Sequence, residues 1–300
     1  MKESESEMAN SNNKGDAVNQ DPFFGMKISP LEPLEGLRRS KCPKCQASRK
    51  YFCYTCYCFM EEGVPEGAFP ATTLPIKIDI IKHPNETDGK STAVHAAVIA
   101  SQDVKLYTYP SIPDYTKEKD NILLLFPGPH SKPMDYYIKS TPKTSAGDKR
   151  KISSDDCTVK GKTPKMSTST ESLVENETSE TILQIPSSVS ASKLIANFDK
   201  VVMIDSTWNQ SYSIFKDERL KGLKCVELVS QKTNYWRKQY NKPDTYLATI
   251  EALYLFVKTY HETFLGKYEG QYDDLLFFFK FFYNMVKKSK SKKKVIKNSS

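Results

Sequence analysis

Segments with the composition of β-strands alternate with helix-like segments, and this order constrains the fold more than any other feature of the chain. The strand-like segments are residues 74–84, 104–110, 121–129, 198–205 and 223–229. The helix-like segments are residues 91–100, 209–220, 243–264 and 275–286. Strands that alternate with helices are typical of α/β proteins with a largely parallel sheet. We therefore predict an α/β fold with flanking helices.

The strand-like segments differ in their expected burial. In residues 74–84, three isoleucines alternate with Lys77 and Asp79, which predicts a strand with one buried face. Residues 121–129 are apolar throughout their middle, as strands buried on both faces are. For the long helix at residues 243–264, Asp244 or Thr245 is the expected N-cap, and Ser91 is expected to cap residues 91–100.

The chain of 300 residues carries a net charge of +8 and has a mean hydropathy of -0.56, so part of it is expected to be polar and unpacked. Polar segments divide the chain into several regions. We predict a disordered tail at residues 1–36, a cysteine-rich module at 38–60 and a main domain at 61–286. Within that domain, residues 138–193 have no sustained period and read as a disordered insertion. Residues 287–300 form a basic tail.

The chain begins without the apolar core of a secretory signal. Its longest apolar run, residues 275–286, is too short to span a bilayer and contains Lys280. We therefore expect an intracellular protein with no membrane association. In a reducing compartment, cysteines act as metal ligands or free thiols.

The cysteines are arranged as two pairs, Cys42-x2-Cys45 and Cys53-x2-Cys56. Two such pairs can present four thiolates to one tetrahedral zinc ion, which leaves no open position for catalysis. We predict a structural zinc site, with Cys58 as a further candidate ligand and four unmetallated thiols as the alternative.

The sequence DSTWNQ begins at Asp205, directly after the apolar residues 201–204. At the carboxyl edge of a parallel sheet, where ligands bind, Asp205, Ser206, Thr207 and Trp208 would meet a substrate. The simpler alternative is a strand end at which the aspartate caps the next helix.

Other segments also allow both a binding and a structural interpretation. Phe126 and Gly128 end a buried strand, where glycine permits close approach to a ligand or forms an ordinary proline turn. Thr249 and Glu251 lie in the first turns of a helix, whose exposed N–H groups can face the carboxylate of a ligand or be capped by these side chains.

Basic and aromatic residues indicate an RNA partner. Lys90 lies in a polar loop, and Trp236 is followed by Arg237 and Lys238, a combination suited to stacking on a base. Residues 287–297 contain seven lysines and no acid. That segment can contact RNA phosphates or act as a nuclear localisation signal.

Five segments occur in one order: CxxC…CxxC, HPNETDGKST, FPGP, DSTW and KPDTYLATIEA. In this order the chain resembles the DTW-domain family, whose D-x-T-W motif fits Asp205, Thr207 and Trp208. The resemblance covers residues 38–285 apart from the insertion. It implies a SPOUT-like knotted sheet that binds S-adenosylmethionine (AdoMet) in its knot loops.

The resemblance also implies a reaction and a set of site residues. The family transfers the 3-amino-3-carboxypropyl group of AdoMet to N3 of a tRNA uridine and releases methylthioadenosine. The family member that this chain most resembles acts on a D-loop uridine, at position 20. The implied catalytic residues are Asp205, Thr207 and Trp208. The implied cofactor-binding residues are Phe126, Gly128, Ser206, Leu247, Thr249 and Glu251. Asp205 would act as a general base or as an orienting charge.

Two other functions fit the same residues. A SPOUT-type RNA methyltransferase would expose the methyl carbon of AdoMet in place of the γ-carbon. A non-catalytic RNA-binding protein would use only the zinc module and the basic tail. For the transferase, the expected partner is tRNA, no protein partner is implied, and the basic segment suggests a nuclear location.

Overall fold

The computed structural model describes residues 21–139, 194–236 and 243–298. They belong to one compact unit, and the predicted insertion lies almost wholly outside them. Five parallel strands form the central sheet: β5 (Lys77–Lys82), β6 (Val104–Thr108), β7 (Ile122–Leu125), β10 (Lys200–Asp205) and β11 (Lys224–Val226). Their order is β11-β7-β10-β5-β6. The predicted α/β fold with a parallel sheet is confirmed.

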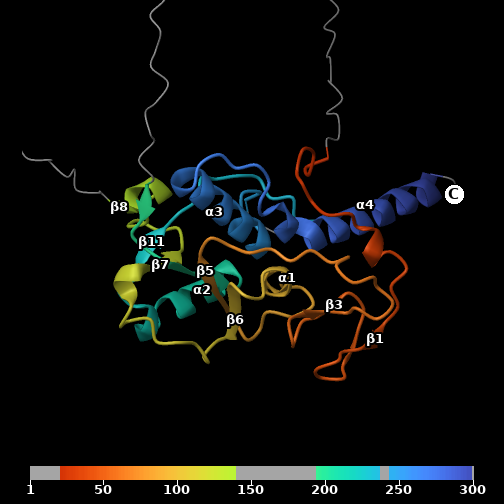
Figure 1. Cartoon of the computed structure of the whole chain (residues 1–300), viewed down its shortest axis with the longest axis horizontal. Coiled ribbons are helices and arrows are strands. Elements are labelled where there is room, and N and C mark those ends of the chain that lie inside the picture. The colour runs from red at the N-terminus through yellow and green to blue at the C-terminus, as the bar shows by residue number, and fades with distance from the viewer. Residues whose placement is uncertain (1–20, 140–193, 237–242, 299–300) are drawn as a thin grey trace, which may run out of the picture. The chain divides into compact units, whose positions relative to one another are not determined.

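Helices cover both faces of the sheet (Figure 1). On one face, Ile78, Val201 and Met203 pack with α1 (Ala93–Ile99), α3 (Thr249–Phe264) and α4 (Phe277–Asn298). On the other face, Ile81 and Val202 pack with α2 (Trp208–Phe215) and the 3-10 helix Glu218–Leu220. All five strands are parallel, so their carboxyl ends meet at one edge.

Strand β5 is buried on both faces, so the prediction of one exposed face is wrong. Asp79 is only 3 % exposed. Tyr115 Oη donates to its carboxylate over 3.1 Å, and Lys200 Nζ lies 3.5 Å away. These partners allow a charged residue to occupy a buried face of the sheet. The alternation of polar and apolar residues in the sequence therefore does not show which face of the strand is exposed to solvent.

Helix α3 begins at Thr249, five residues after the predicted cap Asp244. The Glu251 carboxylate accepts a hydrogen bond from the N–H of Ala248 over 2.8 Å and fixes the first turn there. Thr245 and Leu247 are left outside the helix, where they line a cavity. The N-cap of α1 is Thr92, one residue after the predicted Ser91, whose Oγ accepts from the Ala93 N–H over 3.2 Å.

Residues 21–36 are folded against the main unit, so the prediction of a disordered tail is wrong for this part. Phe23 is buried and packs edge-on against Phe279. The N–H of Lys27 donates to Asp273 over 2.6 Å, and the N–H of Ser29 donates to Asp274 over 2.6 Å. A tract of polar composition is thus held by two carboxylates far along the chain, of which Asp273 is buried.

The remaining elements are three two-stranded antiparallel sheets and four further 3-10 helices. The sheets are β1 (Ser40–Lys41) with β2 (Ser48–Arg49), β3 (Phe52–Cys53) with β4 (Cys58–Phe59), and β8 (Ile138–Lys139) with β9 (Ile195–Ala196). The 3-10 helices are Glu32–Leu34, Lys119–Asn121, Met134–Tyr137 and Asp273–Leu276. Among the described residues, no helix has the length and apolar character needed to cross a membrane.

Candidate active site

Asp205 ends β10, and its carboxylate is buried between the starts of two helices. The residue is 5 % exposed. Ser91 Oγ, just before α1, donates to Asp205 Oδ2 over 2.6 Å. Thr249 Oγ1, at the start of α3, donates to Asp205 Oδ1. This one carboxylate therefore joins the ends of β10, α1 and α3.

Burial raises the pKa of Asp205 above its usual value. The hydroxyls of Ser91 and Thr249 and the charge of Lys82 oppose this effect. Lys82 is the register partner of Asp205 on β5, and its ammonium is paired with Asp88. A carboxylate with a raised pKa accepts a proton more readily at neutral pH than an exposed one.

Thr207, and not Asp205, is the N-cap of α2. Gln210 Oε1 accepts hydrogen bonds from the Thr207 N–H over 3.3 Å and from its hydroxyl over 2.8 Å. The simple alternative, in which Asp205 caps this helix, is therefore wrong. Trp208 is the first residue of α2, and its side chain lies outside the described part of the chain.

A cavity of about 320 Å³ opens at the carboxyl edge of the sheet, and we call it the edge cavity. Its walls are the ends of β7, β10 and β11 and the segment that leads into α3. Four predicted cofactor-binding residues line it: Phe126, Ser206, Leu247 and Thr249. Thr249 also bonds to Asp205, so its hydroxyl connects the cavity to the buried carboxylate.

The other two predicted cofactor-binding residues do not line this cavity. Gly128 lies in an exposed turn closed by Ser131, whose Oγ accepts a hydrogen bond from the Gly128 N–H over 3.2 Å. Glu251 accepts from Thr233 Oγ1 over 2.5 Å and from the Asn234 N–H over 2.7 Å. Its carboxylate caps α3 and fixes a loop, which is the structural alternative for that residue.

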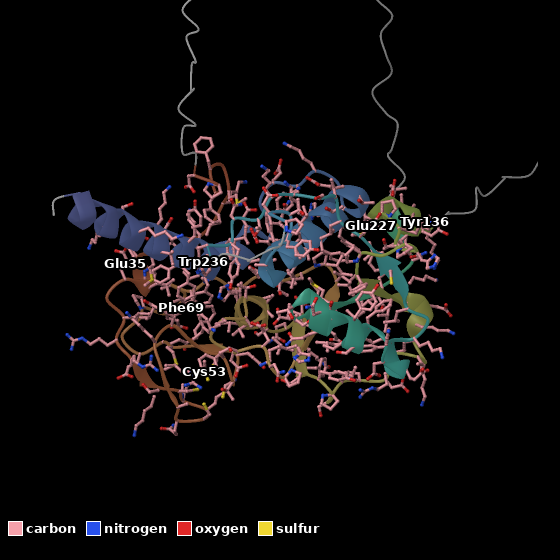
Figure 2. The ribbon with its side chains drawn as sticks, turned by 180° about the vertical axis from the view of Figure 1, so that it is seen from behind. Glu35, Cys53, Phe69, Tyr136, Glu227 and Trp236 are labelled. Carbon is pink, nitrogen blue, oxygen red and sulfur yellow. The ribbon has the colours of Figure 1, made fainter. Side chains whose placement is uncertain are left out.

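Cys42, Cys45, Cys53 and Cys56 form one cluster, with Cys53 labelled in Figure 2. Their sulfur atoms all lie within 4.8 Å of one another. Zinc–sulfur bonds of about 2.3 Å in a tetrahedron require sulfurs roughly 3.8 Å apart, so the donor set fits zinc. Cys58 Sγ lies 3.9 Å from Cys42 Sγ, beside the cluster.

The two cysteine pairs have the same backbone geometry. The N–H of Gln46 donates to the Cys42 carbonyl over 2.9 Å, and the N–H of Tyr57 donates to the Cys53 carbonyl over 2.8 Å. Gln46 has φ 61° and Tyr57 has φ 52°. Each pair thus lies on a tight turn that ends in a left-handed residue, which directs two sulfurs to one point. The N–H groups of Cys45 and Lys44 help to lower the pKa of the Cys42 thiol to about 6.

Trp236 lies beside the exposed part of α4 in a second cavity, which we call the basic groove (Figure 2). Thr233, Asn234, Tyr235, Trp236, Tyr283, Val286, Lys287, Lys290 and Ser291 line it. Tyr235 Oη donates to the carbonyl of Lys90 over 3.3 Å, which brings that predicted RNA-contacting residue to the same region. Arg237 and Lys238 lie outside the described residues.

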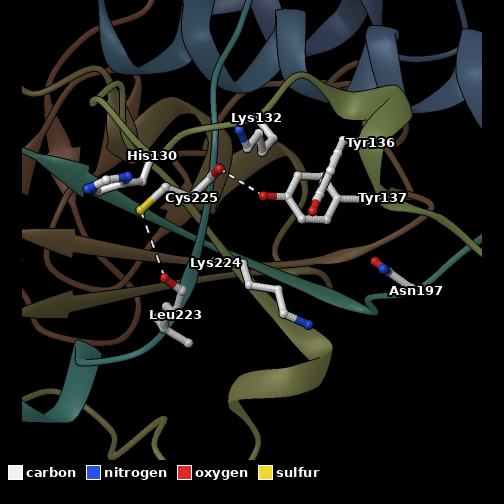
Figure 3. A pocket seen from close by; sticks show the side chains of 8 residues that line it. All are labelled: His130, Lys132, Tyr136, Tyr137, Asn197, Leu223, Lys224 and Cys225. Carbon is white, nitrogen blue, oxygen red and sulfur yellow. Dashed lines mark hydrogen bonds between the residues drawn. The ribbon is translucent and has the colours of Figure 1, made fainter.

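A third cavity, of about 500 Å³, lies at the β11 edge of the sheet (Figure 3). Lys132 and Lys224 are exposed in its wall, and Lys132 Nζ lies 5.8 Å from the Tyr136 ring centroid. Tyr137 Oη donates to the Cys225 carbonyl over 2.9 Å, so it supports the edge strand. None of the predicted site residues that the structure describes lines this cavity.

The model of the DTW domain matches residues 50–287. The chain belongs to the DTW-domain family. Its DTW match begins after the first cysteine pair, Cys42 and Cys45, and includes the second pair.

Curated DTW relatives match most of the chain. The protein named tRNA-uridine aminocarboxypropyltransferase 1 of Xenopus tropicalis is 46% identical over 248 residues, which are 81% of this chain and 78% of the relative. Proteins of the same name from Rattus norvegicus and Homo sapiens are both 42% identical over 247 residues, 81% of this chain and 75% of each relative. No solved structure matches the chain.

Within the DSTW segment, Ser206 lines the edge cavity, whereas Asp205 and Thr207 do not. Asp205 is connected to the cavity wall through its hydrogen bond with Thr249. Sequence reasoning missed Glu227 and Gln231, which also line that wall. Glu227 directly follows β11, so the rule that selected Asp205, a polar residue after an apolar strand, could have found it. Gln231 lies in a loop without any comparable signal.

Proposed function

We propose that this protein is an AdoMet-dependent tRNA-uridine aminocarboxypropyltransferase. The proposal rests chiefly on one observation: the DTW segments at the ends of β7 and β10 and at the start of α3 meet around the edge cavity. The relatives that share these segments carry this activity in their names. AdoMet occupies the edge cavity, and the acceptor is N3 of a D-loop uridine at position 20.

The same cavity supports a knotted sheet of the SPOUT class. In such folds the donor lies in loops at the carboxyl edge of a parallel sheet. Here the cavity is bounded by the loops after β7, β10 and β11, and the strand order is β11-β7-β10-β5-β6. We therefore include the knot in the proposal.

In the proposed reaction, uridine N3 forms a bond to the γ-carbon of the donor as the bond from that carbon to sulfur breaks. The sulfur keeps the bonding electrons and leaves as the neutral thioether methylthioadenosine. Thr249 lines the cavity, and in the proposed reaction its hydroxyl accepts the N3 proton and passes its own proton to Asp205. Asp205 is suited to this role because burial raises its pKa.

Product analysis tests the proposed function. Unmodified tRNA is incubated with the protein and AdoMet, and nucleosides and small products are analysed by mass spectrometry. Aminocarboxypropyluridine and methylthioadenosine should accumulate in equal amounts. Methylated nucleoside with S-adenosylhomocysteine would show a methyltransferase, and no product together with no AdoMet binding would show a non-catalytic protein.

We propose a structural zinc ion at Cys42, Cys45, Cys53 and Cys56, which the sulfur spacing supports. When bound, zinc would stabilise the turns that carry the four thiolates. The cysteine module also packs on the main unit, since the Phe52 ring centroid lies 4.6 Å from that of Phe278 on α4. The metal would thereby hold an apolar surface against α4.

We propose that the basic groove binds the tRNA. It combines Trp236 and Tyr235, whose faces can stack on unpaired bases, with two lysines suited to phosphates. No acidic residue lines it among the described residues. The seven lysines of residues 287–297 extend this charge and also support nuclear import, and we propose a nuclear location.

Replacing Lys287 and Lys290 by alanine should weaken tRNA binding and flatten its salt dependence. Each lost phosphate contact reduces the slope of log affinity against log salt by about one, so a reduction of about two is expected. Binding titrations at several salt concentrations measure this slope. The matched control is Lys132→Ala with Lys224→Ala in the third cavity. A loss of slope in the control pair alone would move the tRNA surface to the β11 edge.

A further inference from the structure

Glu227 is the one acidic side chain among the described residues that line the edge cavity. Within residues 21–139, 194–236 and 243–298, the same wall contains no lysine, arginine or histidine. The wall therefore carries a formal charge of one negative unit. AdoMet carries a positive sulfonium, a positive ammonium and a negative carboxylate at neutral pH. Its net positive charge thus complements the charge of the cavity wall.

The structure also fixes the position of this carboxylate. Glu227 directly follows β11, and its N–H donates to the Lys132 carbonyl over 3.0 Å. Ser131 Oγ lies 2.5 Å from Glu227 Oε2 and can donate to it. The residue is exposed, and no lysine or arginine of the described chain forms an ion pair with it. Glu227 is thus an oriented anion without a cationic protein partner in the described chain (Figure 2).

We propose that Glu227 binds the α-ammonium group of the donor's aminocarboxypropyl chain. This inference rests on the proposed function. The sulfonium is a poorer partner for a carboxylate, because its charge disappears as the carbon–sulfur bond breaks. A carboxylate beside sulfur would stabilise the ground state more than the transition state. The ammonium keeps its charge throughout the transfer, so binding it does not raise the barrier.

The assignment has a consequence for product release. The ammonium leaves the donor with the transferred chain and stays on the modified uridine. Methylthioadenosine has no ammonium and makes no contact with Glu227. Glu227 therefore favours binding of the intact donor over retention of this by-product.

The experiment compares three ligands by calorimetry on wild-type protein and Glu227→Gln. AdoMet has both positive groups, S-adenosylhomocysteine has only the ammonium, and methylthioadenosine has neither. We expect the variant to bind AdoMet and S-adenosylhomocysteine roughly 10- to 100-fold more weakly, the effect of losing a charge-assisted hydrogen bond. Methylthioadenosine should bind both proteins within about 2-fold, which also shows that the variant is folded.

Other outcomes overturn the assignment in distinguishable ways. An equal loss for all three ligands would indicate a contact to ribose or a structural role. A loss confined to AdoMet would indicate the sulfonium, and no loss at all would remove Glu227 from the donor site. Failure of wild-type protein to bind AdoMet would instead overturn the proposed function. Ser131→Ala should give a smaller loss with the same ligand order, because it only orients the carboxylate.

Discussion

Asp205→Asn should lower the single-turnover rate with saturating tRNA by about 10²- to 10⁴-fold, the range for loss of general base catalysis. Asparagine keeps the size of the side chain and can still meet the hydroxyls of Ser91 and Thr249. It cannot accept a proton. AdoMet and tRNA affinity should change much less, because many other contacts supply the binding. Rapid-quench kinetics and calorimetry measure these quantities.

The melting temperature of Asp205→Asn is expected to behave differently from its rate. The pKa of Asp205 is raised in the folded protein, so the folded state binds this proton more readily than the unfolded state does. Its stabilising contribution is present below the unfolded pKa and is lost as pH rises through the folded pKa. At neutral pH the ionised carboxylate costs stability, and the melting temperature of the variant should hold or rise.

Two further measurements separate catalysis from structure. The wild-type rate should decrease as pH falls through the raised pKa of Asp205, because the protonated acid cannot accept a proton. Thr249→Val should reproduce much of the rate loss, whereas Thr249→Ser keeps the hydroxyl and should retain most of the rate. A near-normal rate in Asp205→Asn, with normal pH dependence, would reject the catalytic assignment.

Replacing Cys42 and Cys45 together by serine should lower the melting temperature by about 10 °C or more. Structural zinc supplies folding energy, so its loss should cost several kcal/mol of unfolding free energy. A loss of about 1 kcal/mol lowers the melting temperature of a domain of this size by about 2–4 °C. Loss of zinc would also disrupt the contact between the Phe52 ring of the cysteine module and the Phe278 ring of α4. Melting curves and elemental analysis check the result.

The matched control for the cysteine pair is Cys225→Ser. Cys225 is half-buried on β11 and lies outside the cluster of four sulfurs. It should keep one zinc ion per chain and lose little stability. A wild-type protein that is soluble, active and free of zinc would contradict the metal assignment.

The strands of the sheet and the presence of four helices could be predicted because apolar segments of this length are local signals, but α4 continues to Asn298, well beyond the predicted end at residue 286. The exposure of Asp79 could not, because its burial depends on Tyr115 and Lys200, which are distant in sequence. The start of α3 was displaced for a similar reason. Asp244 is a good cap in isolation, but Glu251 fixes the first turn beside Ala248.

The candidate site was predictable in part. Phe126, Ser206, Leu247 and Thr249 meet at the edge cavity because strand ends and one helix start converge there. Glu251 lies in the same helix start as Thr249 and was predicted to bind the cofactor for the same reason. Its carboxylate instead accepts a hydrogen bond from Thr233 in the neighbouring loop. No local pattern distinguishes a carboxylate that faces a ligand from one that caps its own helix.

That loop has a consequence for the order in which ligands bind. Residues 227–231 line the edge cavity, residues 233–236 line the basic groove, and Glu251 holds the segment at Thr233 and Asn234. Both cavities therefore share one continuous segment, and the Glu251 carboxylate contacts it between the two cavity walls. Donor and tRNA should therefore alter each other's affinity, and thermodynamic linkage requires the same factor in both directions.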